Sequence, residues 1–141
     1  MKATLILIAF LSFGFFACAQ SKSDKELITE AVHNYFEGMI ERDRHKLDMA
    51  FDPNARLIGY RGSVFTITNY EDWATGTSKG QARDPEQYKN EIKQIEIKGY
   101  TAIAKTELFW PGIYYFDFLT LIKIDKQWKI VHKTWYEETV E

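Results

Sequence analysis

The sequence predicts an α+β fold, in which a cone-shaped, curved antiparallel sheet packs on a long N-terminal helix and on shorter helices. Apolar residues recur with helical spacing between Leu27 and Ile40, and from Arg56 onward the pattern becomes strand-like. Aromatic residues make up 16% of the chain, which supplies a large apolar area for a small core. Helices followed by a long run of strands are typical of α+β domains, and 141 residues suit one domain.

Residues 1–19 have the pattern of a secretory signal peptide. Lys2 gives a positive start, and residues 3–16 are almost wholly apolar. That run is shorter than the roughly 20 residues that a membrane-spanning helix needs. A buried N-terminal helix or strand is the alternative, but the run shows neither a helical face nor strand alternation. We therefore expect an exported protein.

Two processing sites overlap at the end of this leader. Ala17-Cys18-Ala19 fits signal-peptide cleavage, whereas Phe16-Ala17-Cys18 resembles a lipobox in which Cys18 would be acylated. The first predicts a periplasmic protein, and the second a protein anchored to the cell envelope by lipid. In both cases residues 20–25 form a short tether, and residues 26–137 form the domain.

Capping signals place the helices. Ser23 and Glu26 have capping-box spacing, so the first helix should begin there and end near Arg42. Residues 46–51 suggest a short second helix, which the turn chemistry of Asp52-Pro53-Asn54 would stop.

The rest of the chain has strand and loop signals. Residues 56–67 are typical of a hairpin around Arg61-Gly62, and Asn69 can cap a short helix carrying Tyr70 and Trp73. Residues 75–85 are polar and glycine-containing, which indicates a loop. The isoleucines that follow break strict alternation, which predicts a sheet-bending bulge near Lys93-Gln94. The predicted long strands cover residues 88–97, 101–110, 114–124 and 127–136.

Composition disfavours several classes of partner and cofactor. The net charge of −2 without a basic cluster is unsuited to nucleic acid. One cysteine cannot form an internal disulfide or a four-thiolate metal site. The three histidines, His33, His45 and His132, show no ligand spacing. We therefore expect no metal and no cofactor, and contact with a membrane only through a lipid anchor.

Short matches in a fixed order resemble the nuclear transport factor 2-like superfamily, in its lumazine-binding, polyketide-cyclase-like branch. They are Tyr35-Phe36-Glu37-Gly38, Leu47 through Leu57, Gly59-Tyr60-Arg61-Gly62, Asn90-Glu91-Ile92, Ala102-Ile103-Ala104-Lys105, 117–121 and 128–131. The resemblance implies a cone-shaped α+β barrel with a deep pocket, and often a dimer formed through the outer sheet face. It implies no particular activity. The ketosteroid-isomerase pattern within the superfamily would place its base at Gly59, which cannot take a proton.

Three side chains are candidates for catalysis. Tyr35 can donate a proton from the first helix, or it can be a core tyrosine at the cavity edge. Asp117 lies between two phenylalanines, and strand alternation favours an outward position beside Leu119 and Leu121. His132 shares the parity of the apolar Trp128 and Ile130, so we expect it to face the cavity. Whether Asp117 and His132 share a face depends on the register of the last hairpin.

Aromatic side chains in the sheet and flanking helix suit a planar or hydrophobic ligand, although they can also simply fill a small core. An arginine near the first hairpin, Arg56 or Arg61, could bind an anionic group. The predicted pocket consists of Tyr35, Met39, Arg56, Tyr60, Trp73, Trp110, Phe118, Thr120 and His132.

Three functions fit these observations. The first is an exported domain that binds a small molecule. The second is an isomerase- or dehydratase-type enzyme using Tyr35 and His132. The third is a module that forms a homodimer or docks a partner through an exposed Leu119–Leu121 face.

Overall fold

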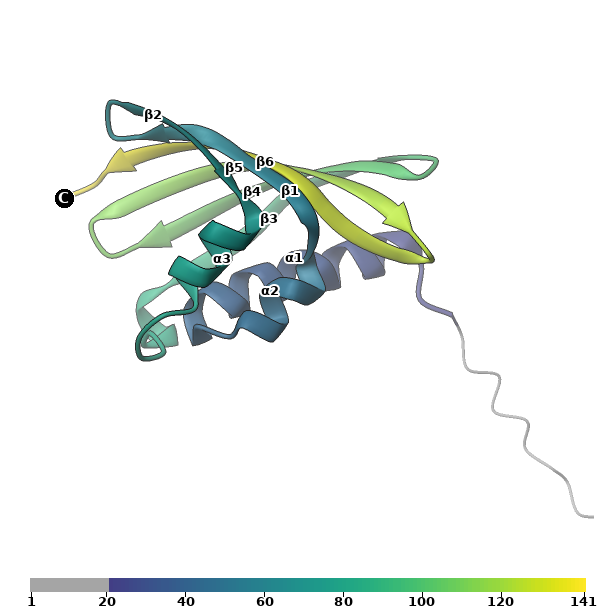
Figure 1. Ribbon diagram of the computed structural model, residues 1–141, viewed down its shortest axis with the longest axis horizontal. Helices are drawn as coiled ribbons and strands as arrows, with labels where there is room; N and C mark the ends of the chain where they lie inside the picture. The colour runs from purple at the N-terminus through teal and green to yellow at the C-terminus, as the bar shows by residue number, and fades with distance from the viewer. Residues whose placement is uncertain (1–20) are drawn as a thin grey trace, which may run out of the picture.

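The computed structural model describes residues 21–141, which fold into a strongly bent sheet with helices on its concave side (Figure 1). The elements are α1 (Asp24–Glu41), α2 (Arg44–Ala50), β1 (Phe51–Arg61), β2 (Val64–Asn69), α3 (Tyr70–Thr77), a 3₁₀ turn (Pro85–Gln87), β3 (Lys89–Lys98), β4 (Thr101–Trp110), β5 (Ile113–Ile124) and β6 (Gln127–Thr139). The predicted α+β class is confirmed, and the predicted long strands agree with the observed ones to within a few residues.

The sheet has six strands in the order β2-β1-β6-β5-β4-β3. Neighbouring strands run antiparallel except β1 and β6, which pair in parallel. The sheet is therefore mixed, whereas the sequence predicts a wholly antiparallel one. The parallel pair arises because the chain leaves β1, builds the β3–β4–β5 meander, and returns with β6 between β5 and β1.

Two irregularities bend the sheet. The β3–β4 register shifts between Ile92 and Gln94, which confirms the predicted bulge. In the β5–β6 pair, Thr120 lies opposite His132 but Leu121 lies opposite Ile130, so Val131 is an extra residue on β6. This second bulge reverses which residues of β6 point into the cone, because side chains alternate along a strand.

The helices begin where the caps predict. The Ser23 side chain accepts the backbone N–H of Glu26, whose carboxylate in turn accepts the N–H of Ser23 at 2.7 Å. Asn69 caps α3 through its side-chain oxygen, which accepts the backbone N–H of Asp72 at 2.8 Å. The residues expected to end α2, Asp52-Pro53-Asn54, lie instead within β1. Asp52 accepts the N–H of Asn54 at 2.8 Å, and this local turn coincides with a register shift in the strand.

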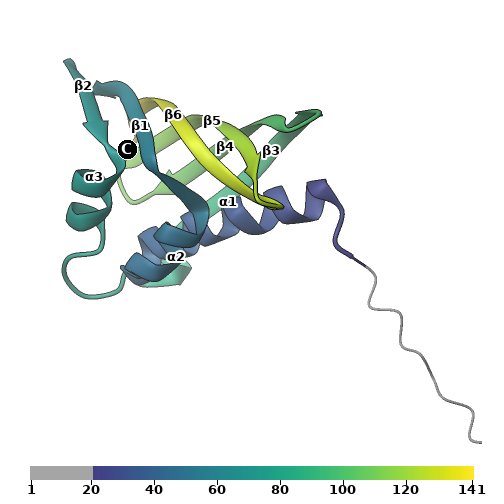
Figure 2. The same ribbon diagram turned by 45° about the vertical axis from the view of Figure 1, so that its right-hand side comes forward.

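The core lies between α1 and the concave face of the sheet (Figure 2). Ile28, Val32 and Tyr35 on α1 are fully buried against it. On β5 the inward residues are Asp117, Leu119 and Leu121, all 0% exposed. The predicted faces of β5 were therefore reversed: Leu119 and Leu121 do not form a docking surface, and Asp117 points inward.

The leader and Cys18 lie outside the described residues, so export and lipidation remain predictions. Within residues 21–141, no helix is both long enough and apolar enough to cross a membrane.

Candidate functional site

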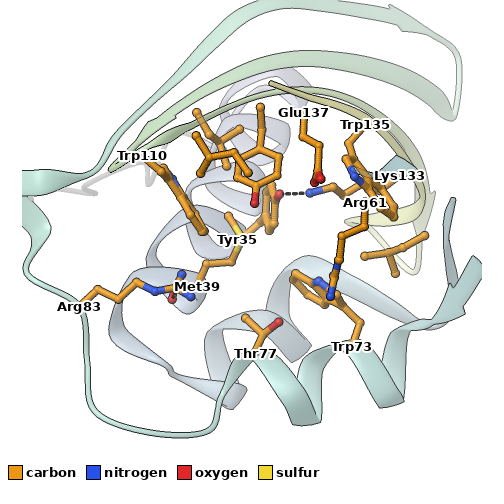
Figure 3. A pocket seen from close by; sticks show the side chains of 14 residues that line it. Tyr35, Met39, Arg61, Trp73, Thr77, Arg83, Trp110, Lys133, Trp135 and Glu137 are labelled. Carbon is orange, nitrogen blue, oxygen red and sulfur yellow. Dashed lines mark hydrogen bonds between the residues drawn. The ribbon is translucent and has the colours of Figure 1, made fainter. Parts of the chain in front are cut away.

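A cavity of about 370 Å³ opens between the concave sheet, α1 and α3 (Figure 3). Five aromatic residues contribute to its wall, together with aliphatic side chains of α1, β1, β4 and β5. The aromatic residues are Tyr35, Trp73, Trp110, Tyr115 and Trp135, and the aliphatic ones are Met39, Leu57, Leu108 and Ile113. The cavity therefore offers flat, largely apolar walls.

Hydrogen bonds hold two of the tryptophan rings in place. The indole N–H of Trp110 donates to Asn90 Oδ1 at 2.9 Å, and that of Trp135 donates to the carbonyl oxygen of Tyr60 at 2.8 Å. Trp135 also packs closely on Gly59, where an added Cβ would lie 2.5 Å from the ring. Both indole N–H groups are thus bonded, and the walls are fixed by the fold.

A buried polar triad forms one end of the cavity. Tyr35 on α1 donates from its hydroxyl to Asp117 Oδ2 at 2.6 Å, and Lys133 Nζ lies 2.9 Å from the same oxygen. Lys133 also donates to the Tyr35 hydroxyl oxygen (Figure 3). Tyr35 and Asp117 are 0% exposed and Lys133 is 7% exposed. Tyr35 and Lys133 line the cavity, while Asp117 lies behind them.

This environment keeps the tyrosine protonated. Burial raises the pKa of Tyr35 well above its usual range, and the nearby negative charge of Asp117 raises it further. A phenolate beside the Asp117 carboxylate would place two negative charges in a dry core. The triad therefore combines a phenol with the ion pair of Asp117 and Lys133.

Two polar atoms beside the triad have no hydrogen-bond partner among the described residues. They are Asp117 Oδ1 and Thr106 Oγ1, both buried. Thr106 lies directly opposite Asp117 in the β4–β5 pair. An unpaired buried polar group lowers the stability of the folded state by about 1–3 kcal/mol, so these two atoms destabilise a small core.

The other charged lining residues are Arg61, Arg83 and Glu137. Within residues 21–141, neither arginine lies within 4.0 Å of a carboxylate oxygen. The Arg83 guanidinium lies 4.6 Å from the Trp110 ring centroid and donates to the carbonyl oxygen of Met39 at 3.3 Å. Burial lowers the pKa of Arg83, and the charge of Arg42 adds to that effect. Glu137 accepts the backbone N–H of Gly62.

The cavity contains four residues of the predicted pocket and leaves five outside. Those inside are Tyr35, Met39, Trp73 and Trp110; those outside are Arg56, Tyr60, Phe118, Thr120 and His132. Alternation along β1 from the buried Leu57 directs Gly59 and Arg61 inward, so Arg56 and Tyr60 point outward. The expectation that His132 faces the cavity is wrong, because the Val131 bulge directs Lys133 inward in its place.

Sequence reasoning missed the inward face of late β6, formed by Lys133, Trp135 and Glu137. The hairpin turn between β5 and β6 consists of two residues, Asp125 and Lys126. Without the Val131 bulge, a two-residue turn would make His132 the diagonal neighbour of Asp117; with the bulge, Lys133 takes that place. One sequence feature could have indicated that Lys133 points inward: Asp117 and Lys133 carry opposite charges and lie in neighbouring strands that are otherwise rich in apolar residues.

Comparison with known proteins places the chain in a family. Residues 23–136 match the family described as "Putative lumazine-binding". The chain belongs to this family. This member of the lumazine-binding family is 27% identical over 121 residues to "Aldolase FrzH" of Cladobotryum sp., covering 82% of this chain and 93% of that protein.

Solved structures confirm the nuclear transport factor 2-like fold. An NTF2-like protein from Shewanella baltica OS155 superposes with a TM-score of 0.74 at 24% identity, covering 82% of this chain and 94% of that one. An NTF2-like protein from Methylobacillus flagellatus KT gives 0.73 at 26% identity, covering 86% and 97%. Fold and family together suggest a ligand-binding domain, and they leave its ligand open.

Proposed function

We propose that this domain binds a small planar or hydrophobic molecule inside the cone. The observation that carries the proposal is the cavity of about 370 Å³, whose aromatic walls are fixed by hydrogen bonds outside the cavity. Ligand pockets commonly measure roughly 300–1,000 Å³ and combine apolar walls with a few polar groups. The family description supports the same function, since lumazine is a planar heterocycle.

Thermal unfolding in the presence of small planar compounds, lumazine among them, tests this proposal. We expect at least one compound to raise the melting temperature in a concentration-dependent way, because binding to the folded state alone stabilises it. The matched variants are Thr77→Phe and Thr75→Phe. Both threonines belong to α3, but only Thr77 lines the cavity. Ligand stabilisation should disappear in Thr77→Phe and persist in Thr75→Phe; equal stabilisation in both would place the binding site elsewhere.

A second candidate function is carbonyl chemistry within the same cavity. A phenol, a carboxylate and an ammonium meet in a nearly buried site, where the Lys133 ammonium faces the cavity and can stabilise the oxyanion that develops when a ketone loses the proton next to its carbonyl group. The relative named an aldolase supports this function. The version that pairs Tyr35 with His132 is not supported, because His132 lies on the other face of β6.

Proton–deuterium exchange at the carbon next to a ketone, followed by NMR, tests this second candidate. We expect exchange faster than in buffer, reduced by Tyr35→Phe and unchanged by His132→Ala. If ketones that bind the protein exchange no faster than in buffer, the second candidate function is contradicted and the binding function remains.

A further inference from the structure

We propose that the cavity binds its ligand in one orientation, as a planar carbonyl compound that also carries an anionic group. The carbonyl oxygen lies at Lys133, and the anionic group lies at Arg83, on the opposite side of the cavity (Figure 3). This inference rests on the proposed binding function and adds to it the chemical class of the ligand.

The carbonyl end follows from the donors that the triad leaves free. The Lys133 ammonium has three N–H donors, of which one is hydrogen-bonded to Tyr35, and it forms an ion pair with Asp117. At least one remaining N–H is available to an oxygen in the cavity, which Lys133 lines. Because the Asp117 carboxylate neutralises the ammonium, the triad has no net charge. It therefore suits an uncharged acceptor such as a carbonyl oxygen better than a full anion.

Tyr35 and Asp117 are positioning residues at this end. The Tyr35 hydroxyl accepts from Lys133 and donates to Asp117, so its own proton is already engaged. Together the two residues hold the ammonium at the cavity wall.

The anionic end follows from the charges that line the rest of the cavity. Arg61 and Arg83 contribute two positive charges and Glu137 one negative charge, which leaves an excess of one positive charge. Arg83 is half-buried, and its single hydrogen bond to Met39 leaves other N–H donors free. Arg61 extends into the cavity from the end of β1 (Figure 3).

The two ends lie within one cavity, on either side of flat walls. Tyr115 belongs to this wall. Burial raises its pKa, the negative charges of Glu137 and Asp117 raise it further, and the positive charges of Arg61 and Arg83 oppose them. Trp110 meets Tyr115 edge to face, with ring centroids 5.5 Å apart. A flat conjugated framework between a carbonyl and an acid group fits such walls better than a flexible chain does.

Three benzene derivatives test the orientation: 4-acetylbenzoate, 4-ethylbenzoate, which lacks the carbonyl oxygen, and acetophenone, which lacks the carboxylate. Calorimetric titration of the wild-type protein should show that 4-acetylbenzoate binds about fivefold to tenfold more tightly than either of the others, since each lacks one polar contact. Equal affinity for 4-ethylbenzoate would overturn the carbonyl end, and equal affinity for acetophenone would overturn the anionic end.

The same titrations separate this inference from the proposed function. If other planar compounds stabilise the protein through the cavity but none of these three binds, the inference fails and the binding function stands. If no planar compound of any kind binds, both fail.

Variants assign each end to its residues. Arg83→Gln should abolish the preference for 4-acetylbenzoate over acetophenone, while Lys79→Gln, in the exposed part of the same loop, should preserve it. Infrared spectroscopy of carbonyl-labelled 4-acetylbenzoate gives a readout that needs no variant. A hydrogen bond from Lys133 should lower the carbonyl stretching frequency of the bound ligand below that in a non-hydrogen-bonding solvent. An unchanged frequency would contradict the Lys133 contact.

Discussion

Lys133 Nζ lies 2.9 Å from Asp117 Oδ2 in the interior of the cone, where Asp117 is 0% exposed and Lys133 is 7% exposed. The two residues are diagonal neighbours on β5 and β6, and the Val131 bulge makes them so. A buried ion pair contributes little net stability compared with an apolar pair of similar volume, because both charges lose their hydration. Its presence here supports a role for the pair in the cavity.

Removing one charge of this pair should lower the free energy of unfolding strongly, and removing both charges should lower it less. Asp117→Asn or Lys133→Met alone should lower the free energy of unfolding by about 3–5 kcal/mol, because each leaves one buried charge without its partner. The double variant should lose less than either single variant. Urea denaturation measures all three, and additive losses would show that the two side chains do not interact. Lys22→Met, which removes an exposed ion pair with Glu30, serves as the surface control and should change little.

Alkaline pH should destabilise the protein partly through Tyr35. Because its pKa is raised in the folded state, the unfolded chain releases this proton first as the pH rises above about 10. The unfolded state then binds fewer protons, so the free energy of unfolding falls with pH, by at most about 1.4 kcal/mol per pH unit for one tyrosine. The contribution of Tyr35 to the free energy of unfolding is fully present below about pH 10.

Tyr35→Phe isolates this contribution. The variant should lose about 1–3 kcal/mol near neutral pH, where its hydrogen bonds are missing, and the difference from wild type should shrink above about pH 10. Urea unfolding across that pH range measures the difference. A constant difference would mean that Tyr35 titrates as an ordinary exposed tyrosine.

Because Gly59 has no side chain, the ring of Trp135 in the cavity wall can pack directly against the backbone of β1. Gly59→Ala would place a Cβ 2.5 Å from Cδ2 of Trp135, so we expect a loss of about 1–3 kcal/mol and a changed tryptophan fluorescence spectrum. Gly76→Ala is the matched control, because no atom lies within 4 Å of its added Cβ and its backbone angle is ordinary. It should leave stability equal or slightly higher, since alanine favours a helix. Similar losses in both variants would argue against the tight packing of Trp135.

The outer face of the sheet remains the predicted dimer surface, with different residues from those expected. Phe118 is 46% exposed, Ile103 is 43% exposed and Tyr136 is 56% exposed. The Phe116 ring lies beside that of Phe118, tilted by 55° with centroids 5.1 Å apart. Sedimentation should show a dimer that Phe118→Lys dissociates and that Met49→Lys, at an exposed apolar residue of α2 on the opposite side of the sheet, leaves intact. A monomer at all concentrations of the wild-type protein would contradict this prediction.

Local chemistry made the helices and strand limits predictable. The Ser23–Glu26 box and the Asn69 cap act through neighbouring backbone groups, and the stripe on α1 has one consistent face. These signals depend on nearby residues alone, so the sequence reveals them. The bulge near Lys93 was also visible, because isoleucines on one strand changed parity.

The composition of the site was harder to predict, because it depends on the pairing of distant strands. A bulge at Val131 leaves no compositional trace, yet it exchanges His132 for Lys133 inside the cone. Asp117 is inward although a carboxylate is normally expected at the surface, since its partners come from α1 and β6. The pairing of β5 with β6 is what brings the charge of Lys133 to that of Asp117, so that neither charge is buried alone.

NMR of protein labelled on its methionine methyl groups tests the central claim, that the ligand occupies the cavity, most directly. Met39 lines the cavity and is 4% exposed, whereas Met49 is 42% exposed and lies outside it. We predict that a compound that stabilises the protein will shift the Met39 methyl signal to saturation and leave that of Met49 in place. A stabilising compound that moves Met49, or leaves Met39 unchanged, would show that binding occurs outside the cone and would contradict the account.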